Sequence, residues 1–215
     1  MEPVVVIGLG RFGTALATEL VRVGTEVLAI DAQESVVQRL SGQLGQVVTA
    51  DSTDIDALRE LGVDQFERAV VAIGNDQQSS ILTTALLAEL EIADIWAKAL
   101  DGQHARILAR IGAHHVVQPE VEMGERIAHL VSGRMLDYIG LDRDWGMIKA
   151  HPPRGIVGTP LGQTRLRARH RVTVVSVKPE GQEDFTYADA ETVLRYGDEI
   201  LVVGRLEDLE RFAAS

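Results

Sequence analysis

A glycine-rich stretch near the N-terminus carries the residues best suited to ligand chemistry. Gly8, Gly10 and Gly13 follow the pattern G-x-G-x-x-G directly after the apolar run VVVI. In a strand–turn–helix setting the first glycine permits a tight turn, the second lets a pyrophosphate approach the backbone, and the third lets the helix pack on the strand. The phosphates would then meet free N–H groups and the positive end of the helix dipole. The pattern predicts a dinucleotide site.

Two charged residues refine this prediction. Asp31 ends the next apolar run, EVLAID, at the position from which a carboxylate accepts hydrogen bonds from ribose hydroxyls. A carboxylate there would repel a 2′-phosphate, which disfavours NADP. Arg11 stands between the glycines, either as a surface arginine or as a cation that reaches a terminal phosphate through charge-assisted hydrogen bonds. The second interpretation would matter for ATP more than for NAD.

Further residues should face the same crevice, because ligands bind at the carboxyl ends of parallel strands. We expect Asp51 and Ser52 near the base, and Lys98 near a phosphate. Asp51 could instead cap the helix that follows it. The predicted nucleotide-binding residues are Gly8, Gly10, Arg11, Phe12, Gly13, Asp31, Ala32, Asp51, Ser52, Ile73, Gly74, Asn75 and Lys98.

Residues for catalysis are not evident. A dehydrogenase needs a general acid or base near the hydride acceptor, and no histidine stands in a recognisable acid–base, triad or metal-pair context. The chain has no cysteine, which excludes thiolate metal sites and cysteine nucleophiles. We therefore predict a protein that is not an enzyme. The six histidines are His104, His114, His115, His129, His151 and His170.

The elements that must position these residues alternate between apolar runs and amphipathic stretches, as in repeated βαβ units. Six expected strands precede Glu120, and the central ones are apolar on both faces, as a parallel sheet covered on both sides requires. The prediction is an α/β fold, a Rossmann-like doubly wound parallel sheet. The expected strands are residues 4–8, 26–31, 46–51, 68–74, 94–100 and 115–120.

A different organisation is expected after Glu120. Residues 121–140 are predicted to form one helix, because Ile127, Met135 and Ile139 contribute to an apolar face at three- and four-residue spacing. Short strands with polar turns and a final helix over 206–213 then indicate a small α+β domain. The predicted organisation is a nucleotide-binding domain at 1–120, a linking helix at 121–140 and a C-terminal domain at 145–215.

Composition narrows the function classes further. The 215 residues carry a formal net charge of −11, which argues against a general nucleic-acid binder. The run RLRARHR (165–171) is an exception, and we interpret it as a solvated segment or as a local anion or subunit contact. Apolar runs of about six residues are too short for a membrane span of roughly 20. Because the first strand leaves no room for a signal peptide, we expect a cytoplasmic protein.

In sequence the chain resembles the RCK family, the regulators of potassium conductance, and in particular the cytoplasmic subunits of bacterial Trk and Ktr potassium uptake systems. The resemblance covers nearly the whole chain, and the ordered series of motifs is more specific than the glycine loop alone. A single copy of the two-domain unit favours the Ktr-type arrangement. The motifs are VVIGLGRFG, VLAID, ADSTD (50–54), VVAIGND (70–76), IGAHHVVQPEVEMGERIA (111–128) and LRYGDEILVVG (194–204).

The resemblance implies a gating subunit without catalytic activity. In such proteins an octameric ring, a tetramer of dimers, lies under an integral-membrane potassium channel subunit at the inner face of the membrane, and helix 121–140 crosses between protomers. ATP/ADP or NAD/NADH would bind the Rossmann site, Glu120 would lie near a divalent cation, and the stretch Arg169–Pro179 would bind cyclic di-AMP. The alternatives are an NAD-dependent oxidoreductase, and a redox or NAD sensor that acts on another partner.

Overall fold

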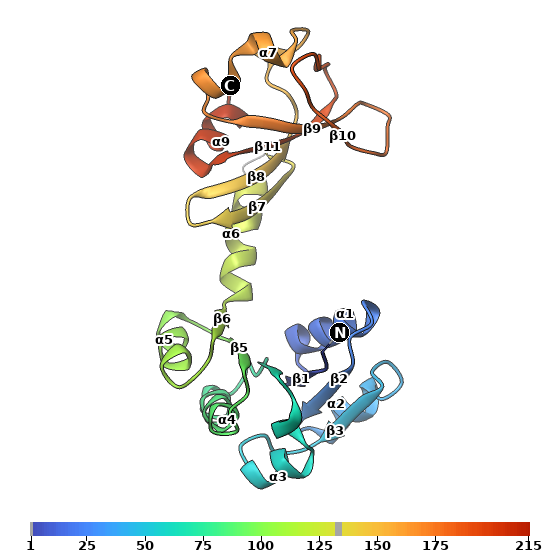
Figure 1. Cartoon of the computed structure of the whole chain (residues 1–215), viewed down its shortest axis with the longest axis vertical. Coiled ribbons are helices and arrows are strands. Elements are labelled where there is room, and N and C mark those ends of the chain that lie inside the picture. The colour runs from blue at the N-terminus through green and yellow to red at the C-terminus, as the bar shows by residue number, and fades with distance from the viewer. Residues whose placement is uncertain (1, 132–134) are drawn as a thin grey trace. The chain divides into compact units, whose positions relative to one another are not determined.

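The computed structural model describes residues 2–131 and 135–215, which divide into two compact units, one up to Glu120 and one from Val121 onward (Figure 1). In the described part of the chain, no helix is long and apolar enough to cross a membrane.

The first unit is built on a parallel sheet of six strands in the order β3-β2-β1-β4-β5-β6. This is the predicted doubly wound arrangement, and the expectation of six strands before Glu120 is confirmed. The order reverses between β1 and β4, so the crevice at the carboxyl ends of these two strands is the place where such sheets bind ligands. The strands are β1 (Val4–Ile7), β2 (Val27–Asp31), β3 (Gln46–Thr49), β4 (Arg68–Val71), β5 (Asp94–Lys98) and β6 (His115–Val117).

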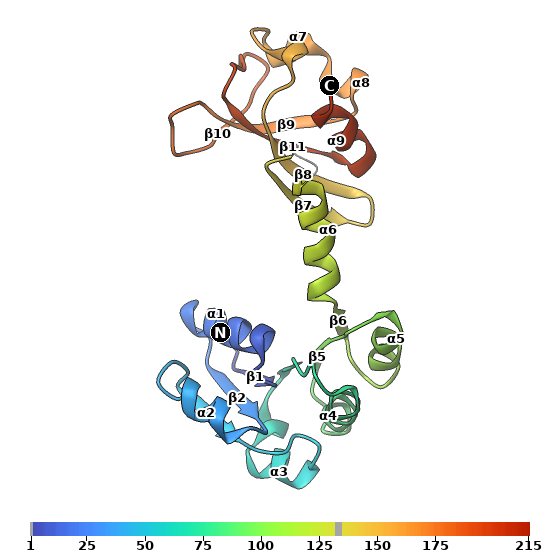
Figure 2. The same ribbon diagram turned by 180° about the vertical axis from the view of Figure 1, so that it is seen from behind.

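Helices cover both faces of this sheet (Figures 1 and 2). On one face, Val4, Val6 and Ala29 pack with side chains of α1 and α2. On the other face, Leu58, Leu87 and Leu108 of α3, α4 and α5 join the strand residues in a larger core, as strands that are apolar on both faces require. The helical segments are α1 (Arg11–Arg22), α2 (Glu34–Leu40), α3 (Ile55–Glu60), the 3-10 turn η1 (Val63–Gln65), α4 (Gln77–Glu89) and α5 (Gly102–Arg110).

The sheet face that carries α1 and α2 is more exposed at strands β5 and β6. The strand register places Trp96 of β5 beside Val70 of β4, and Val70 beside Val6 of β1. Trp96 and His115 of β6 are both exposed there, and their rings stack with centroids 4.1 Å apart. This part of the first unit therefore presents an aromatic surface to solvent.

The prediction of a single helix over 121–140 is wrong. Helix α6 spans Pro119–Val131, residues 132–134 of the predicted helix lie outside the described residues, and Asp137–Asp142 form strand β7. Met135 and Ile139 were expected on one helix face, yet Met135 is 5% exposed and Ile139 is 47% exposed. Strand pairing explains the difference, because β7 forms an antiparallel hairpin with β8 (Trp145–Ala150), in which Gly140 lies opposite Gly146.

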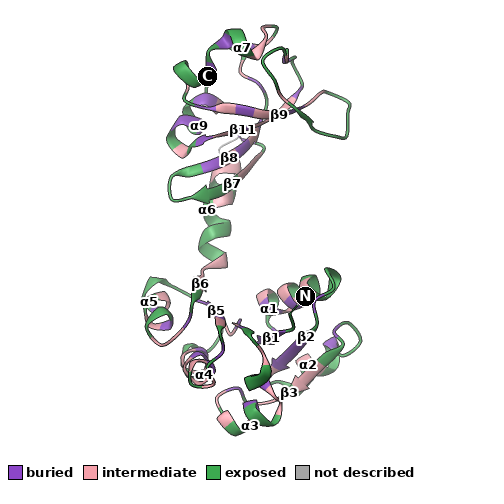
Figure 3. Ribbon diagram, viewed as in Figure 1, coloured by how far each residue is buried: buried purple, intermediate pink, exposed green. Residues whose placement is uncertain are grey.

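The second unit contains an antiparallel sheet of five strands in the order β10-β9-β11-β8-β7, with helices on the core face (Figure 3). The expected α+β class is confirmed, and so is the closing helix, α9 at Leu206–Ala213. Strand β7 precedes the start predicted for this domain at residue 145. The other elements are β8 (Trp145–Ala150), η2 (Arg154–Ile156), α7 (Leu161–Thr164), α8 (Leu166–Arg169), β9 (Thr173–Lys178), β10 (Thr186–Tyr187) and β11 (Glu199–Arg205).

Candidate nucleotide-binding site

The three glycines of the fingerprint have different steric reasons to be glycine. Gly8 has φ +92°, and a Cβ there would lie 2.9 Å from the backbone nitrogen of Ile73. A Cβ on Gly13 would lie 1.9 Å from the carbonyl oxygen of Gly8, so no larger residue fits between α1 and β1. A Cβ on Gly10 would meet nothing within 4 Å. The space that a Cβ of Gly10 would occupy is therefore open to a ligand.

The glycine loop leads straight into the N-terminus of α1. The helix begins at Arg11, and its N-cap residue is Gly10, which has no side chain to accept from the first N–H groups. Thr14 holds the loop in place, because its Oγ1 donates to the carbonyl of Leu9 at 2.8 Å. The free N–H groups and the helix dipole together favour an anion at this end of the crevice.

Asp31 lies at the end of β2 and fixes the same loop. Its Oδ2 accepts from the backbone N–H of Leu9 at 2.7 Å, and its Oδ1 accepts from that of Gln33 at 2.8 Å. Each carboxylate oxygen retains further lone pairs for a ribose hydroxyl. The neighbouring Ala32 is exposed and leaves the approach to this carboxylate uncluttered.

The two residues expected near the base have other contacts as well. Asp51 is exposed, and its Oδ1 accepts from the N–H of Thr53 at 2.9 Å and from the hydroxyl of Thr53 at 2.7 Å, which lowers the pKa of Asp51. The N-cap of α3 is Asp54, so Asp51 is not the cap that the alternative interpretation suggested. Ser52 is buried, and its hydroxyl lies 2.8 Å from that of Thr83 on α4. Ser52 therefore anchors the loop to α4.

The loop after β4 borders the crevice opposite the glycine loop. Ile73 packs against Gly8, as the close approach of its backbone nitrogen requires. A Cβ on Gly74 would lie 3.1 Å from Nζ of Lys98, so this glycine leaves room for the lysine head. Asn75 is exposed just before Asp76, which caps α4 by accepting from Gln78 and Ser79.

Lys98 and Glu120 form an ion pair at the end of the crevice. Nζ of Lys98 lies 2.6 Å from Oε1 of Glu120, and the Lys98 side chain is 9% exposed against 63% for Glu120. The Phe12 ring centroid lies 5.8 Å from the same Nζ, in a cation–π arrangement. The hydrogen bond from Lys98 lowers the pKa of Glu120, and the charge of Arg11 contributes in the same direction. Arg11 and Lys98 thus concentrate positive charge at one place.

The predicted site residues therefore divide into those at the crevice and those that make local contacts elsewhere. The glycines, Phe12, Arg11, Gly74 and Lys98 lie around the crevice between β1 and β4, and Asp31 borders it from β2. Ser52 turns to α4, and Asp51 closes a local turn. Sequence reasoning missed Thr14, whose hydroxyl holds the glycine loop, and Thr83, whose hydroxyl holds the loop of Ser52. The position of Thr14 next to the glycine motif and that of Thr83 on α4 could have indicated them.

A divalent cation at Glu120 finds few ligands in this chain. Among residues 2–131 and 135–215, no three His, Asp or Glu side chains gather as a metal site, and Glu120 already has Lys98 as its partner. The described side chains of one copy therefore do not fit a resident metal ion on their own.

The histidines all take part in structural contacts. His114 accepts from the N–H of Ile95 through Nδ1 at 3.0 Å, His115 stacks on Trp96, and His151 bonds the carbonyl of Asp198 at 2.9 Å. His129 packs on Tyr138, and His170 meets Phe212 edge-on. His104 is buried.

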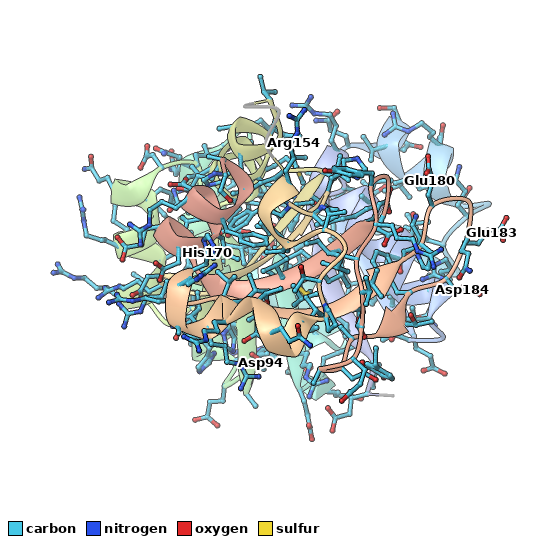
Figure 4. All side chains as sticks on the ribbon, turned by 90° about the horizontal axis from the view of Figure 1, so that it is seen from above. Asp94, Arg154, His170, Glu180, Glu183 and Asp184 are labelled. Carbon is cyan, nitrogen blue, oxygen red and sulfur yellow. The ribbon has the colours of Figure 1, made fainter. Side chains whose placement is uncertain are left out.

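The basic run of the second unit surrounds α8. Arg165 and Arg171 flank the helix with φ of 54° and 57°, an uncommon conformation for residues other than glycine. Nε of Arg167 donates to the hydroxyl of Thr173 at 3.2 Å. In Figure 4, the labelled Glu180, Glu183 and Asp184 lie on the loop between β9 and β10. The predicted cyclic di-AMP stretch runs from α8 into β9.

Fold and site together define a two-unit protein with a Rossmann-like α/β unit and a small antiparallel α+β unit. The TrkA-N domain family matches residues 4–119, and the TrkA-C domain family matches residues 147–215. The chain belongs to the RCK family of TrkA-N and TrkA-C domain proteins, as the resemblance predicted.

Similar proteins share nearly the full length of the chain. Ktr system potassium uptake protein C of Bacillus subtilis (strain 168) is 37% identical over 208 residues, which is 96% of this chain and 94% of that protein. Ktr system potassium uptake protein A of Vibrio alginolyticus is 36% identical over 205 residues, 95% of this chain and 93% of that protein.

Among solved structures, the GsuK RCK domain matches 99% of this chain with a TM-score of 0.55 and 26% identity. The GsuK channel bound to NAD matches the whole chain with the same TM-score and identity. The chain spans 46% and 39% of those two chains, respectively.

Proposed function

We propose that this protein is a nucleotide-sensing regulatory subunit of a potassium uptake system, located on the cytoplasmic side of the membrane and without catalytic activity. Two relatives that match this chain over more than nine-tenths of their own length are potassium uptake proteins of Ktr systems. The observation that carries the nucleotide part is the crevice between β1 and β4, in which an uncapped helix N-terminus, an open glycine and Asp31 converge.

The contacts of the histidines and carboxylates among the described residues suit a sensing function better than hydride transfer. In the described residues, each histidine that could shuttle a proton is engaged in a backbone or ring contact, and Asp31 and Asp51 accept from backbone N–H groups. A nucleotide in this site would act by its difference in affinity between two shapes of the assembly, where every 1.4 kcal/mol is about tenfold.

The charge at the end of the crevice favours ATP and ADP as the ligands. Arg11 lies at the first position of α1, and both Arg11 and Lys98 act on Glu120. A terminal phosphate placed there would replace Glu120 as the partner of these two cations and would form charge-assisted hydrogen bonds with them. The third phosphate of ATP is then the group that distinguishes it from ADP. A divalent cation would take its remaining ligands from phosphates or from a second copy.

NAD and NADH are the second candidate pair, because the GsuK channel, which matches the whole chain at 26% identity, was solved bound to NAD. Asp31 suits the ribose hydroxyls of either pair. The two ligand pairs differ in what they offer to Arg11, since only ATP ends in a free triphosphate.

Two exposed apolar surfaces support assembly with further copies of the chain. Met123, Ile127 and Val131 of α6 are 51%, 46% and 80% exposed and recur at a four-residue spacing on one side of the helix. Trp96 is exposed on the open part of the first sheet. Homo-oligomerisation, with the octameric ring and the crossing helix expected from the resemblance, would cover such surfaces.

A membrane channel subunit completes the proposed assembly, since a regulator of potassium uptake needs a pore to act on. Cyclic di-AMP at Arg169–Pro179 is a further proposal from the resemblance. The arginines around α8 support it by placing positive charge beside β9.

The proposal is tested by titrating the purified chain with ATP, ADP, NAD and NADH and by following turnover. We expect binding without hydrolysis or hydride transfer. Arg11→Ala should lower the affinity for ATP by about tenfold, which corresponds to one charge-assisted hydrogen bond, and should change ADP or NAD binding less. Arg59→Ala, which removes an exposed arginine of α3, is the matched control. Unchanged relative affinities in Arg11→Ala would remove the function assigned to Arg11.

A further inference from the structure

His104 is the buried titratable side chain that the site described above does not use. It lies in the first turn of α5, which follows the loop after β5, and the residue is 2% exposed. Its Nδ1 accepts a hydrogen bond from the backbone N–H of Leu100 at 3.3 Å. The imidazole therefore holds the turn that directly follows Lys98.

This turn borders the nucleotide crevice. A Cβ on Gly74 would lie 3.1 Å from Nζ of Lys98 and 3.9 Å from Cδ2 of Leu100, so both residues meet the loop after β4. Lys98 also contacts Glu120 and the ring of Phe12. A displacement of the Leu100 backbone would therefore change the position of the cation that faces the phosphates.

Packing alone does not account for a histidine at this position. An imidazole that accepts through Nδ1 must carry its hydrogen on Nε2. Nε2 is buried and makes no hydrogen bond to any described residue. A buried donor without an acceptor costs about 1–3 kcal/mol, so a leucine would fill the space at lower cost. The contact that a histidine makes here and a leucine could not make is the hydrogen bond that Nδ1 accepts from the Leu100 N–H.

We propose that His104 is a positioning residue of the nucleotide site, which holds the β5–α5 turn only while its imidazole is neutral and which makes nucleotide affinity depend on pH. The inference rests on the proposed nucleotide binding and adds a regulatory property to the same site. Protonation places a hydrogen on Nδ1, so the Leu100 N–H loses its acceptor and meets a donor instead.

The charges around His104 set the direction of this switch. Burial lowers the pKa of His104, and the carboxylate of Asp101, which caps α5, partly opposes this by favouring the cation. On the neighbouring elements, Asp76 caps α4 and Lys98 ends β5, where Lys98 is paired with Glu120. The ring is therefore neutral near pH 7, and the turn is released only as the solution becomes acidic.

Two variants separate positioning from packing. In His104→Gln, the side-chain carbonyl can accept from the Leu100 N–H and cannot be protonated in this range. In His104→Leu, the space is filled and the acceptor is lost. Both are compared with the full-length parent by titration with ATP and with NAD at pH 8 and pH 5.5. NAD is included because its phosphates keep their charge across this interval.

We expect the parent to lose affinity for NAD as the pH falls from 8 to 5.5, by up to about fivefold, the scale of one hydrogen bond. The glutamine variant should bind as the parent does at pH 8 and lose the pH dependence. The leucine variant should bind about fivefold more weakly at both pH values while unfolding at an equal or higher denaturant concentration. Parent-like affinity in the leucine variant, or a parent-like pH profile in the glutamine variant, would overturn the proposal.

Hydrogen exchange at the Leu100 amide separates this inference from the proposed function. The amide should be protected in the parent and in His104→Gln and should exchange faster in His104→Leu. If the parent binds none of the nucleotides while this pattern holds, the proposed function fails and the structural part of the inference stands. If the parent binds nucleotide and the Leu100 amide exchanges equally in all three proteins, His104 does not hold the turn.

Discussion

The carboxylate of Asp31 accepts a hydrogen bond from the backbone N–H of Leu9 at 2.7 Å and so joins the end of β2 to the glycine loop. The same side chain fixes Gln33 through its second oxygen. One residue thus shapes the loop before a ligand arrives and offers lone pairs to a ribose. Its position is consequently preorganised, and the loop loses little further freedom on binding.

Replacement of Asp31 should therefore weaken every nucleotide that carries a free ribose diol. We expect Asp31→Ala to lower affinity for ATP and NAD alike by about tenfold to a hundredfold, the range for hydrogen bonds to a charged group. Calorimetric titration measures the effect. Asp64→Ala, which removes an exposed carboxylate from η1, is the control and should bind normally. Equal losses in both variants would mean that general charge, not the diol contact, is responsible.

Substitutions of Gly13 and Gly10 should affect folding stability and nucleotide binding differently. Gly13→Ala places a Cβ 1.9 Å from the carbonyl of Gly8 and should destabilise the first unit by about 2–3 kcal/mol, as overpacking does. Gly10→Ala meets open space at an ordinary φ of −66°, so its unfolding free energy should stay within about 0.5 kcal/mol of the parent.

Gly10→Ala should nevertheless bind nucleotide poorly, because its methyl group occupies the side from which a pyrophosphate approaches the backbone. Urea unfolding and an ATP titration of the same samples measure the two quantities. Full nucleotide affinity in a stable Gly10→Ala protein would place the phosphates elsewhere than at the start of α1.

The ion pair between Lys98 and Glu120 predicts a dependence on pH. Because Lys98 lowers the pKa of Glu120, the pair stabilises the folded chain above the ordinary glutamate pKa of about 4.3, and this contribution is lost as the pH falls through the lowered value. Glu120→Gln should cost about 1 kcal/mol at pH 7, less than a fully buried pair, since Glu120 is largely exposed.

A double-mutant cycle with Lys98→Met isolates this pair. The Glu120→Gln change should have little effect once Lys98 is absent, and its effect in the parent should be smaller at pH 3 than at pH 7. A loss of equal size in both backgrounds would show that Glu120 acts through other contacts than Lys98.

The sequence predicted the first unit well because its signals are local and strong. The glycine spacing has a direct steric cause at Gly8 and Gly13, and the strands buried on both faces read as continuous apolar runs. The contacts of Ser52 with Thr83 and of His104 with Leu100 could not be predicted, because they join side chains to atoms whose proximity only the folded chain creates.

The helix predicted over 121–140 failed for a different reason. Apolar residues at three- and four-residue spacing also occur where a helix is followed by a strand, so Met135 and Ile139 matched a helical period by coincidence. Gly140 and Gly146 argued against a continuous helix, because glycine disfavours a helix interior. In the structure the two glycines lie opposite each other in the β7–β8 hairpin.

In the second unit, Glu199 provides a prediction for acid stability. Lys149 and Lys178 lie 2.8 and 2.7 Å from its Oε2 and lower its pKa to about 2. An unfolded glutamate binds its proton near pH 4.3, so the stabilisation is complete above that pH and is lost as the pH falls toward 2.

Between pH 7 and pH 3 the parent should lose about 1–2 kcal/mol through this group, after allowance for partial solvent screening. Glu199→Gln should be less stable at pH 7 and should lose correspondingly less on acidification. Denaturant unfolding followed by Trp145 fluorescence in a Trp96→Phe background reports on this unit, because Trp145 lies on β8 beside β11. Identical pH profiles for both proteins would exclude Glu199 as the source.

The exposed residues of α6 give the test of assembly. Ile127 and Val131 lie four residues apart on one side of the helix, and an aspartate at either position would bring an uncompensated charge into an apolar contact. We expect Ile127→Asp or Val131→Asp to shift the protein to a smaller oligomer in light scattering while its unfolding free energy, measured on the dissociated form, changes by less than about 0.5 kcal/mol. Val21→Asp makes the same change at an exposed apolar position of α1 and should leave the oligomer intact. An oligomer that persists in both α6 variants would show that its contacts lie on another surface.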